Sequence, residues 1–90
     1  MKIKIKIEGK ESLYDLDRVH YISSLDVGNL IIVNHPETHQ LCRAKVVMRY
    51  DRRIEVVEDT RHDAPYRWGI TKSDLFDQVF LVRKQYKSGG

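Results

Sequence analysis

From Leu25 to Arg83 the chain is a series of short apolar runs separated by turn residues, and this pattern limits the possible folds more than any other feature. The first run, 30–33, follows a turn at 26–29, and the last run is 79–82. Apolar runs of about four to eight residues bounded by turns predict strands, since helices need about ten residues or more. Several such strands within a chain of 90 residues predict a small β-barrel.

Lysine and isoleucine alternate without a break through residues 2–7, and Gly9 follows soon after. Because successive side chains of a strand point to opposite faces, this alternation predicts a strand with one buried face and one exposed face. The isoleucines Ile3, Ile5 and Ile7 form the apolar face, and the lysines Lys2, Lys4 and Lys6 form the charged face.

Residues 41–58 predict a hairpin with a short polar link at 51–53. Its first strand alternates, so Cys42, Ala44, Val46 and Met48 are expected in the core, and Arg43, Lys45 and Arg49 are expected to point outward. Further strands are predicted at 66–70 and 79–82, with one short helical turn near Ser73–Phe76 between them. These elements predict an all-β barrel of five to six strands.

Residues 10–24 are open to more than one interpretation. Leu13, Leu16 and Val19 recur at roughly helical spacing, and Ser12 is a suitable first residue, so a short helix over residues 12–20 is one expectation. A long ordered loop, or an irregular hairpin between the first two strands, fits the same residues.

The chain is expected to form one domain over residues 1–84, followed by a disordered polar tail over residues 85–90. With 41% hydrophobic and 32% charged residues, the composition is that of a soluble globular protein. No apolar run approaches the roughly 20 residues of a membrane-spanning helix, and lysines interrupt any signal-peptide core near the start. Cys42 is the single cysteine, so no internal disulfide forms. We therefore expect a cytoplasmic protein without a membrane partner.

A strand led in by Val27-Gly28, a basic hairpin, a strand with Trp68-Gly69, one helical turn and a short closing strand follow one another over residues 25–83. This order resembles the SH3-like barrel superfamily, with residues 10–24 in the position of the long loop after the first strand. The resemblance implies a small β-barrel that binds peptides, modified protein tails or nucleic acids.

A narrower resemblance is to HIRAN domains, small β-barrels that bind DNA, in some members by holding the end of a single strand. The features that follow this family's order are the glycine-led strand 28–33, Pro36, Ala44 with Val46, and Gly69-Ile70. The departures are Leu41 and Arg43, where the family has Asp and Asn, and Ile70 and Lys72, where it has Tyr and Pro. The resemblance implies DNA binding, and the departures fall on the pocket for the DNA end.

Residues 28–33 with His35-Pro36 are also similar to the opening strand of toxin ribonucleases of the MazF type. The arginine and threonine pair that those enzymes use has no clear counterpart in this chain. Independently of that resemblance, His39 and His62 lie in polar loops beside acidic residues, and a ribonuclease could use one histidine as base and another as acid, with an arginine on the phosphate. The chain has no nucleophile elbow, phosphate-binding glycine loop or zinc-protease signature. We therefore expect no enzymatic activity.

A zinc site is a further candidate, since His35, His39, Cys42 and His62 are residue types that bind zinc. However, Pro36 opposes the helix that would bring the first two histidines to one side. Exposed loop histidines and a buried cysteine are the competing interpretation, and we expect no metal or other cofactor.

An aromatic cage is another candidate. Tyr66 and Trp68 lie two residues apart on one strand face, and with Tyr14 or Tyr21 they could enclose a cationic side chain. The competing interpretation is that these rings pack in the core.

The leading interpretation is a basic strand face that binds nucleic acid. Lysine and arginine neutralise phosphates and release counterions, and aromatic rings stack on unpaired bases. The predicted contact residues are Lys2, Lys4, Lys6, Arg43, Lys45, Arg49, Arg52, Arg53, Tyr66, Arg67 and Trp68. The competing interpretation is that the lysines protect an exposed sheet edge and that the rings pack in the core.

These observations predict a non-enzymatic binding module whose leading partner is DNA or RNA, with no small-molecule substrate. The alternative is a small protein-interaction module, an inhibitor or adaptor of the kind that phages and mobile elements encode, which acts through its loops and strand edges. The arrangement of basic residues on the folded surface distinguishes the two: one continuous positive face favours nucleic acid, and scattered charge favours a protein partner.

Overall fold

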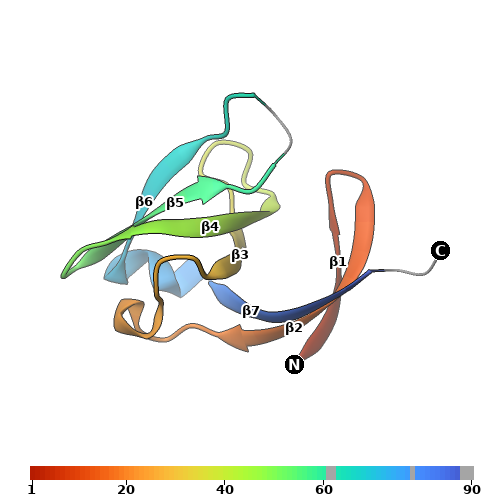
Figure 1. The fold of residues 1–90 in the computed structure, drawn as a ribbon, viewed down its shortest axis with the longest axis horizontal. Helices are drawn as coiled ribbons and strands as arrows, with labels where there is room; N and C mark the ends of the chain where they lie inside the picture. The colour runs from red at the N-terminus through yellow and green to blue at the C-terminus, as the bar shows by residue number, and fades with distance from the viewer. Residues whose placement is uncertain (61–62, 78, 88–90) are drawn as a thin grey trace.

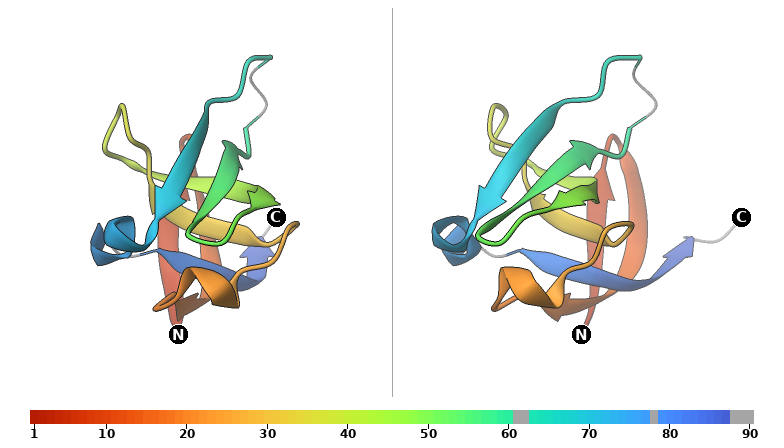
Figure 2. Two further views of the ribbon diagram at one scale, coloured as in Figure 1. Left: turned by 90° about the vertical axis from the view of Figure 1, so that its left-hand side faces the viewer. Right: turned by 60° about the vertical axis from the view of Figure 1, so that its left-hand side comes forward.

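The computed structural model describes residues 1–60, 63–77 and 79–87, which form one antiparallel sheet that curls into a half-barrel (Figures 1 and 2). The strands are β1 (Lys2–Ile7), β2 (Lys10–Arg18), β3 (Leu30–Asn34), β4 (Leu41–Arg49), β5 (Arg53–Glu58), β6 (Arg67–Thr71) and β7 (Phe80–Lys87). Their order across the sheet is β1-β2-β7-β3-β4-β5-β6. The predicted all-β class is confirmed, with seven strands in place of the expected five to six.

The additional strand is β2, which forms a hairpin with β1. Glu8 and Gly9 connect the two strands, and both have positive φ angles, 52° and 77°. A two-residue turn of this kind matches the right-handed twist of the strands that it joins. The helix over residues 12–20 therefore does not form, and the hairpin interpretation of this segment is correct. Leu13 produced the helical spacing, although it lies on the opposite face of β2 from buried Leu16 and Tyr14.

The core has two parts, on opposite faces of β3. Ile31 and Val33 point into the larger part and Ile32 into the smaller one, so the centre of β3 is buried on both sides. The large cluster contains Val19, Ile22, Leu25, Ile31, Val33, Cys42, Ala44, Val46, Ile54, Val56, Ile70 and Val79. The small cluster contains Ile5, Tyr14, Leu16 and Ile32.

The β4 strand changes face at a bulge between Val46 and Met48. Before the bulge the predicted alternation is confirmed, and Cys42, Ala44 and Val46 are buried. Beyond it Met48 lies opposite Glu55 and is 42% exposed, so the prediction that Met48 belongs to the core is wrong. An extra residue in one strand moves every later side chain to the other face.

Two 3₁₀ turns complete the described structure, η1 (Ile22–Ser24) and η2 (Lys72–Asp77). The second confirms the predicted helical turn, and the Asp74 carboxylate accepts a hydrogen bond of 2.7 Å from the Thr71 N–H just before it. Within the described ranges no helix has the length and apolar character to cross a bilayer.

The end of β7 corrects the predicted limit of the domain. Residues 85–87 were expected in a disordered tail, but they extend β7 and pair with β2 at Tyr14, Leu13 and Ser12. The pairing gives β2 a hydrogen-bonded neighbour from Ser12 to Arg18, including its buried residues Ser12, Tyr14 and Leu16. The rest of the predicted tail, 88–90, lies outside the described residues.

Candidate binding surfaces

The predicted basic face is divided in the structure, because β1 pairs with β2 and not with β4. Lys2, Lys4 and Lys6 are exposed on the side of β1 that points away from the small cluster. Their cross-strand neighbours on β2 are Asp15, Leu13 and Glu11. The lysines therefore stand in a row along the outermost strand, separate from the basic residues of β4.

Arg43 is held inside the fold and is not a free basic side chain. It shares a face of the sheet with Ile32 and is about two-thirds buried, with its Nε 2.7 Å from Asp59 Oδ2. Its guanidinium also donates to the Gln85 side-chain oxygen, and the Gln85 amide lies 3.3 Å from the hydroxyl of buried Ser12. Arg43 thus connects β4 to β7 and β2.

The remaining predicted arginines on strands also have acidic partners. Arg49 lies beyond the bulge, where its guanidinium donates to Asp26 Oδ1 at 3.1 Å and to the Ser23 carbonyl at 3.0 Å. Arg53 and Arg67 both pair with the Glu55 carboxylate, at 3.7 Å and 2.9 Å. Among the described residues, the predicted basic contacts without an ion pair are Lys2, Lys4, Lys6, Lys45 and Arg52.

Tyr66 and Trp68 lie close together, but on the face of the sheet opposite Arg67. Their ring centroids are 5.7 Å apart, and those of His35 lie 4.9 Å from Tyr66 and 5.5 Å from Trp68. Trp68 packs against the large cluster and Tyr66 is 37% exposed. The expected cage partners are elsewhere: Tyr14 belongs to the small cluster and Tyr21 is largely exposed beside η1. The three rings mainly fill space between β6 and the loop after β3.

His35 is a buried histidine that organises this loop, a role that the sequence did not reveal. Its Nδ1 accepts hydrogen bonds from the Glu37 and Thr38 N–H groups, and its Nε2 lies 3.4 Å from Glu58 Oε2. Both ring nitrogens are thus engaged. Pro36, directly after His35 at the end of an apolar run, was the one local signal of this tight turn.

In the part of the chain that the structure describes, the Cys42 thiol is not activated and no metal site is found. Burial, followed by the charges of Glu58 and Glu8, raises the pKa of the Cys42 thiol to about 11, so the thiol stays protonated at neutral pH. No group of three His, Cys, Asp or Glu side chains in the described ranges could hold a metal. His39 lies in the exposed loop, and His62, the other expected catalytic residue, is outside the described residues.

The edge of the sheet at β1 borders a groove that the sequence did not predict. The groove has a volume of about 380 Å³, and its apolar lining consists of Ile3, Ile5, Leu16, Ile32, Leu41 and Phe80. Lys4, Lys6 and Asn34 complete the rim. Leu41, at the start of β4, is 41% exposed there. The groove exists because β1 approaches β4 in space without pairing with it.

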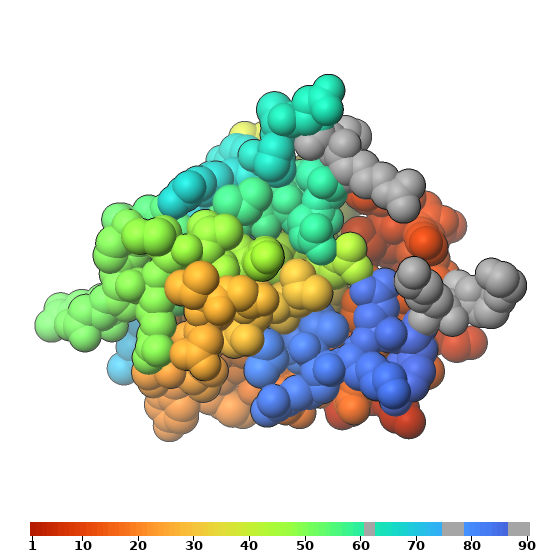
Figure 3. Space-filling view, viewed as in Figure 1, coloured from red at the N-terminus to blue at the C-terminus, as the bar shows by residue number. Residues whose placement is uncertain are grey.

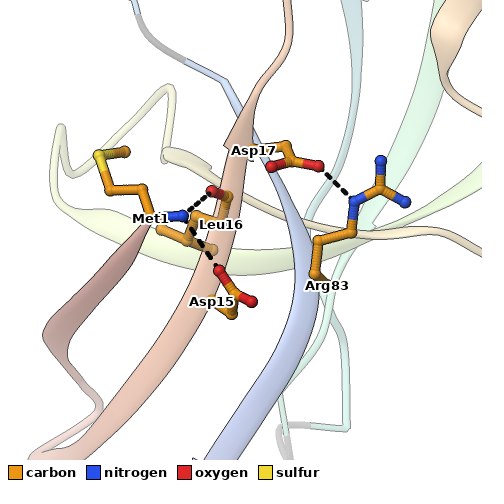
Figure 4. A network of polar contacts seen from close by, with 5 residues as sticks. All are labelled: Met1, Asp15, Leu16, Asp17 and Arg83. Atoms are coloured by element: carbon orange, nitrogen blue, oxygen red, sulfur yellow. Dashed lines mark hydrogen bonds and ion pairs between the residues drawn. The ribbon is translucent and has the colours of Figure 1, made fainter.

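Polar contacts fasten β1 and its neighbours at one end of this edge (Figure 4). The Met1 amino group lies 3.0 Å from Asp15 Oδ1 and 3.1 Å from the Leu16 carbonyl oxygen. On the next strand pair Arg83 of β7 forms an ion pair with Asp17 of β2. In the space-filling view β7 (blue) lies beside the red part of the β1–β2 hairpin (Figure 3).

A second, more polar groove of about 590 Å³ lies near the other end of the hairpin. Its lining includes Ser12, Tyr14, Arg43, Asp59 and Gln85. Its main charged pair, Arg43 with Asp59, is already satisfied within the fold. Glu8 and Lys10 add two further charged side chains to this lining.

Comparison of the chain with protein-family models, with curated proteins and with solved structures gives no significant match. The structure shows a small barrel-like all-β domain, and no family is assigned to it.

Proposed function

We propose that this protein is a non-enzymatic protein-interaction module that acts through the open β1 edge of its sheet. The observation that carries this proposal is the groove beside β1, where an outermost strand borders an apolar surface. Strand edges present unpaired backbone groups that template the addition of another strand, and many recognition domains bind peptides in this way.

The distribution of charge supports a protein partner over nucleic acid. Arg43, Arg49, Arg53 and Arg67 are occupied by carboxylates of the chain itself, so phosphates would have to displace these acidic partners. Tyr66 and Trp68 pack against His35 on the opposite face from Arg67, where stacking bases would not meet the basic residues. The predicted basic contacts therefore do not form one continuous positive face.

Nucleic-acid binding is the second candidate, favoured by the row of Lys2, Lys4 and Lys6 on exposed β1. Side chains two residues apart on one strand face are separated by about 6.6 Å. A row at this spacing could neutralise several phosphates of an extended single strand, and such binding would weaken steeply as salt rises.

A selection experiment tests the proposal. The protein is immobilised and used to select from a phage-displayed library of random peptides, and the selected peptides are titrated by calorimetry and mapped by backbone amide NMR shifts. We expect saturable binding with the largest shifts in β1 and β2. Failure to recover any binding peptide, together with salt-sensitive binding of labelled DNA or RNA oligonucleotides in fluorescence anisotropy, would overturn it in favour of the second candidate.

A further inference from the structure

We infer that the β1 edge recognises an extended peptide segment in which acidic side chains alternate with apolar ones. This inference rests on the proposed protein-interaction function and specifies the chemistry of the partner. It follows from three properties of β1: the direction of its backbone groups, the two different faces of its side chains, and the charge of the lysines.

The backbone of β1 offers hydrogen-bonding groups at alternate residues. Leu16 N–H donates to the Met1 carbonyl at 2.7 Å and the Met1 amine contacts the Leu16 carbonyl, so Met1 faces β2. In an antiparallel pair, residues alternate between facing the partner and facing away from it. The N–H and C=O groups of Lys2, Lys4 and Lys6 therefore point away from β2, to the side where the described sheet has no further strand.

A strand added at this edge would meet a different surface on each of its faces. Directly opposite residues of paired strands point to the same face. Residues of the partner opposite the lysines would share their exposed face, where carboxylates would be favoured. Residues opposite Ile3 and Ile5 would point toward Leu41 and Phe80 in the groove, where apolar side chains would be favoured.

The lysine row supplies the charge complementarity that selects the partner. Lys4 and Lys6 have no ion pair among the described residues, and Lys2 lies with its Nζ 5.4 Å from the Tyr86 ring centroid. A second copy of this chain would place lysine against lysine, which is destabilising, so a symmetric pairing of two β1 strands is disfavoured.

The other edge of the sheet, β6, is less suitable for adding a strand, because the Thr71 N–H is already bonded to Asp74.

The experiment compares three labelled six-residue peptides by fluorescence anisotropy: alternating Glu and Val, the same composition in two blocks, and alternating Lys and Val. We expect saturable binding of the first, binding about tenfold or more weaker for the second, and none for the third. Lys4→Glu should weaken binding of the alternating acidic peptide about three- to tenfold. The matched control is Lys45→Glu, which changes an exposed lysine of β4 outside the groove and should leave the affinity for this peptide unchanged.

A proline variant separates backbone pairing from simple charge attraction. The Lys4 N–H points away from β2, so Lys4→Pro removes a hydrogen bond to the partner but none within the hairpin. We expect Lys4→Pro to keep the native circular dichroism spectrum and to lose binding well beyond Lys4→Ala. Equal binding by the two variants would overturn strand addition.

The outcomes also separate this inference from the proposed function. Equal affinity for the alternating and block peptides would overturn the alternation, while a library-selected peptide that shifts β1 amides would leave the protein-interaction function standing. Binding of oligo(dT) to the same lysines, without binding of any peptide, would overturn both.

Discussion

The two faces of β3 differ in how completely the rest of the chain covers them. On one face, the large cluster is enclosed by β4, β5, β6 and η1, and residues such as Leu25, Ile54 and Val56 are fully buried. On the other face, the small cluster has four buried residues among those that the structure describes, and Ile3, Ile7, Phe80 and Val82 around it are partly exposed. The difference indicates that one face holds most of the core and the other leaves apolar surface exposed to solvent.

The charges follow the same division. On β4, β5 and β6, four arginines have carboxylate partners: Asp59 pairs with Arg43, Asp26 with Arg49, and Glu55 with Arg53 and Arg67. Along β1, Lys4 and Lys6 have no such partners among the described residues. The positive charge of the paired arginines is thus largely neutralised, whereas that of Lys4 and Lys6, beside the apolar groove, is not.

The largest effect is expected in the large cluster. Ile54→Ala should lower the free energy of unfolding by about 2–5 kcal/mol, because it removes fully buried methyl groups and leaves a cavity that rigid neighbours cannot fill. Urea denaturation followed by the fluorescence of Trp68, the single tryptophan, measures the change. The control is Val57→Ala, on the opposite face of the same strand, which should cost about 1 kcal/mol or less. Equal losses would contradict the assignment of the core.

A smaller effect is expected in the small cluster. Ile5→Ala should cost about 2 kcal/mol, at the low end for such a change, because Ile5 lies on the outermost strand beside an open groove. Amide hydrogen exchange should also accelerate in β1 more than in β5, since the edge hairpin can open locally. Uniform acceleration in both strands would show that the two clusters form one cooperative unit, and would remove the distinction between the faces.

The sequence predicted the strands well because their signals are local. Alternation identified β1 and the first half of β4, and an apolar run identified β3. The basic face depended on which strands are neighbours, and pairing is decided by non-local contacts that no short pattern contains. A single basic face would have required residues 2–7 to lie beside residues 41–50, but the Glu8-Gly9 turn joins β1 to β2. The sequence contains these turn residues. However, the apolar Leu13 lies on the less buried face of β2 and interrupts the alternation that would have predicted this strand.

Two further features of the candidate site could not be predicted. The bulge after Val46 moves Arg49 to the other face of the sheet, and nothing in the local alternation announces it. The pairing of Arg43 with Asp59 and Gln85 joins residues that are far apart in the chain or lie in a loop. The sequence therefore predicted more free positive charge than the structure has, because the acidic partners of Arg43 and Arg49 come from distant loops.

The third prediction concerns Cys42, which lies in the large cluster. Burial first, and then Glu58 and Glu8, raise the pKa of its thiol from 9.0 to about 11. Between these values the unfolded chain has lost the thiol proton and the folded protein retains it, so the stability that this group contributes is lost as pH rises from about 9 to about 11. Cys42→Ala lacks this component. Urea denaturation at several pH values should therefore show a steeper decline for the native sequence than for the variant, and parallel declines would contradict the burial of the thiol.

The smallest effect is expected for the exposed ion pairs that occupy the predicted basic face. Arg67→Ala should change the free energy of unfolding by about 0.5 kcal/mol or less, because exposed ion pairs contribute little and Arg53 still pairs with Glu55. The double variant Arg53→Ala with Arg67→Ala should lose more than the sum of the single changes, since Glu55 then loses both partners. Urea denaturation of the four proteins measures this coupling. Additive losses would mean that the two arginines do not share Glu55, and that at least one of them is available to bind a phosphate.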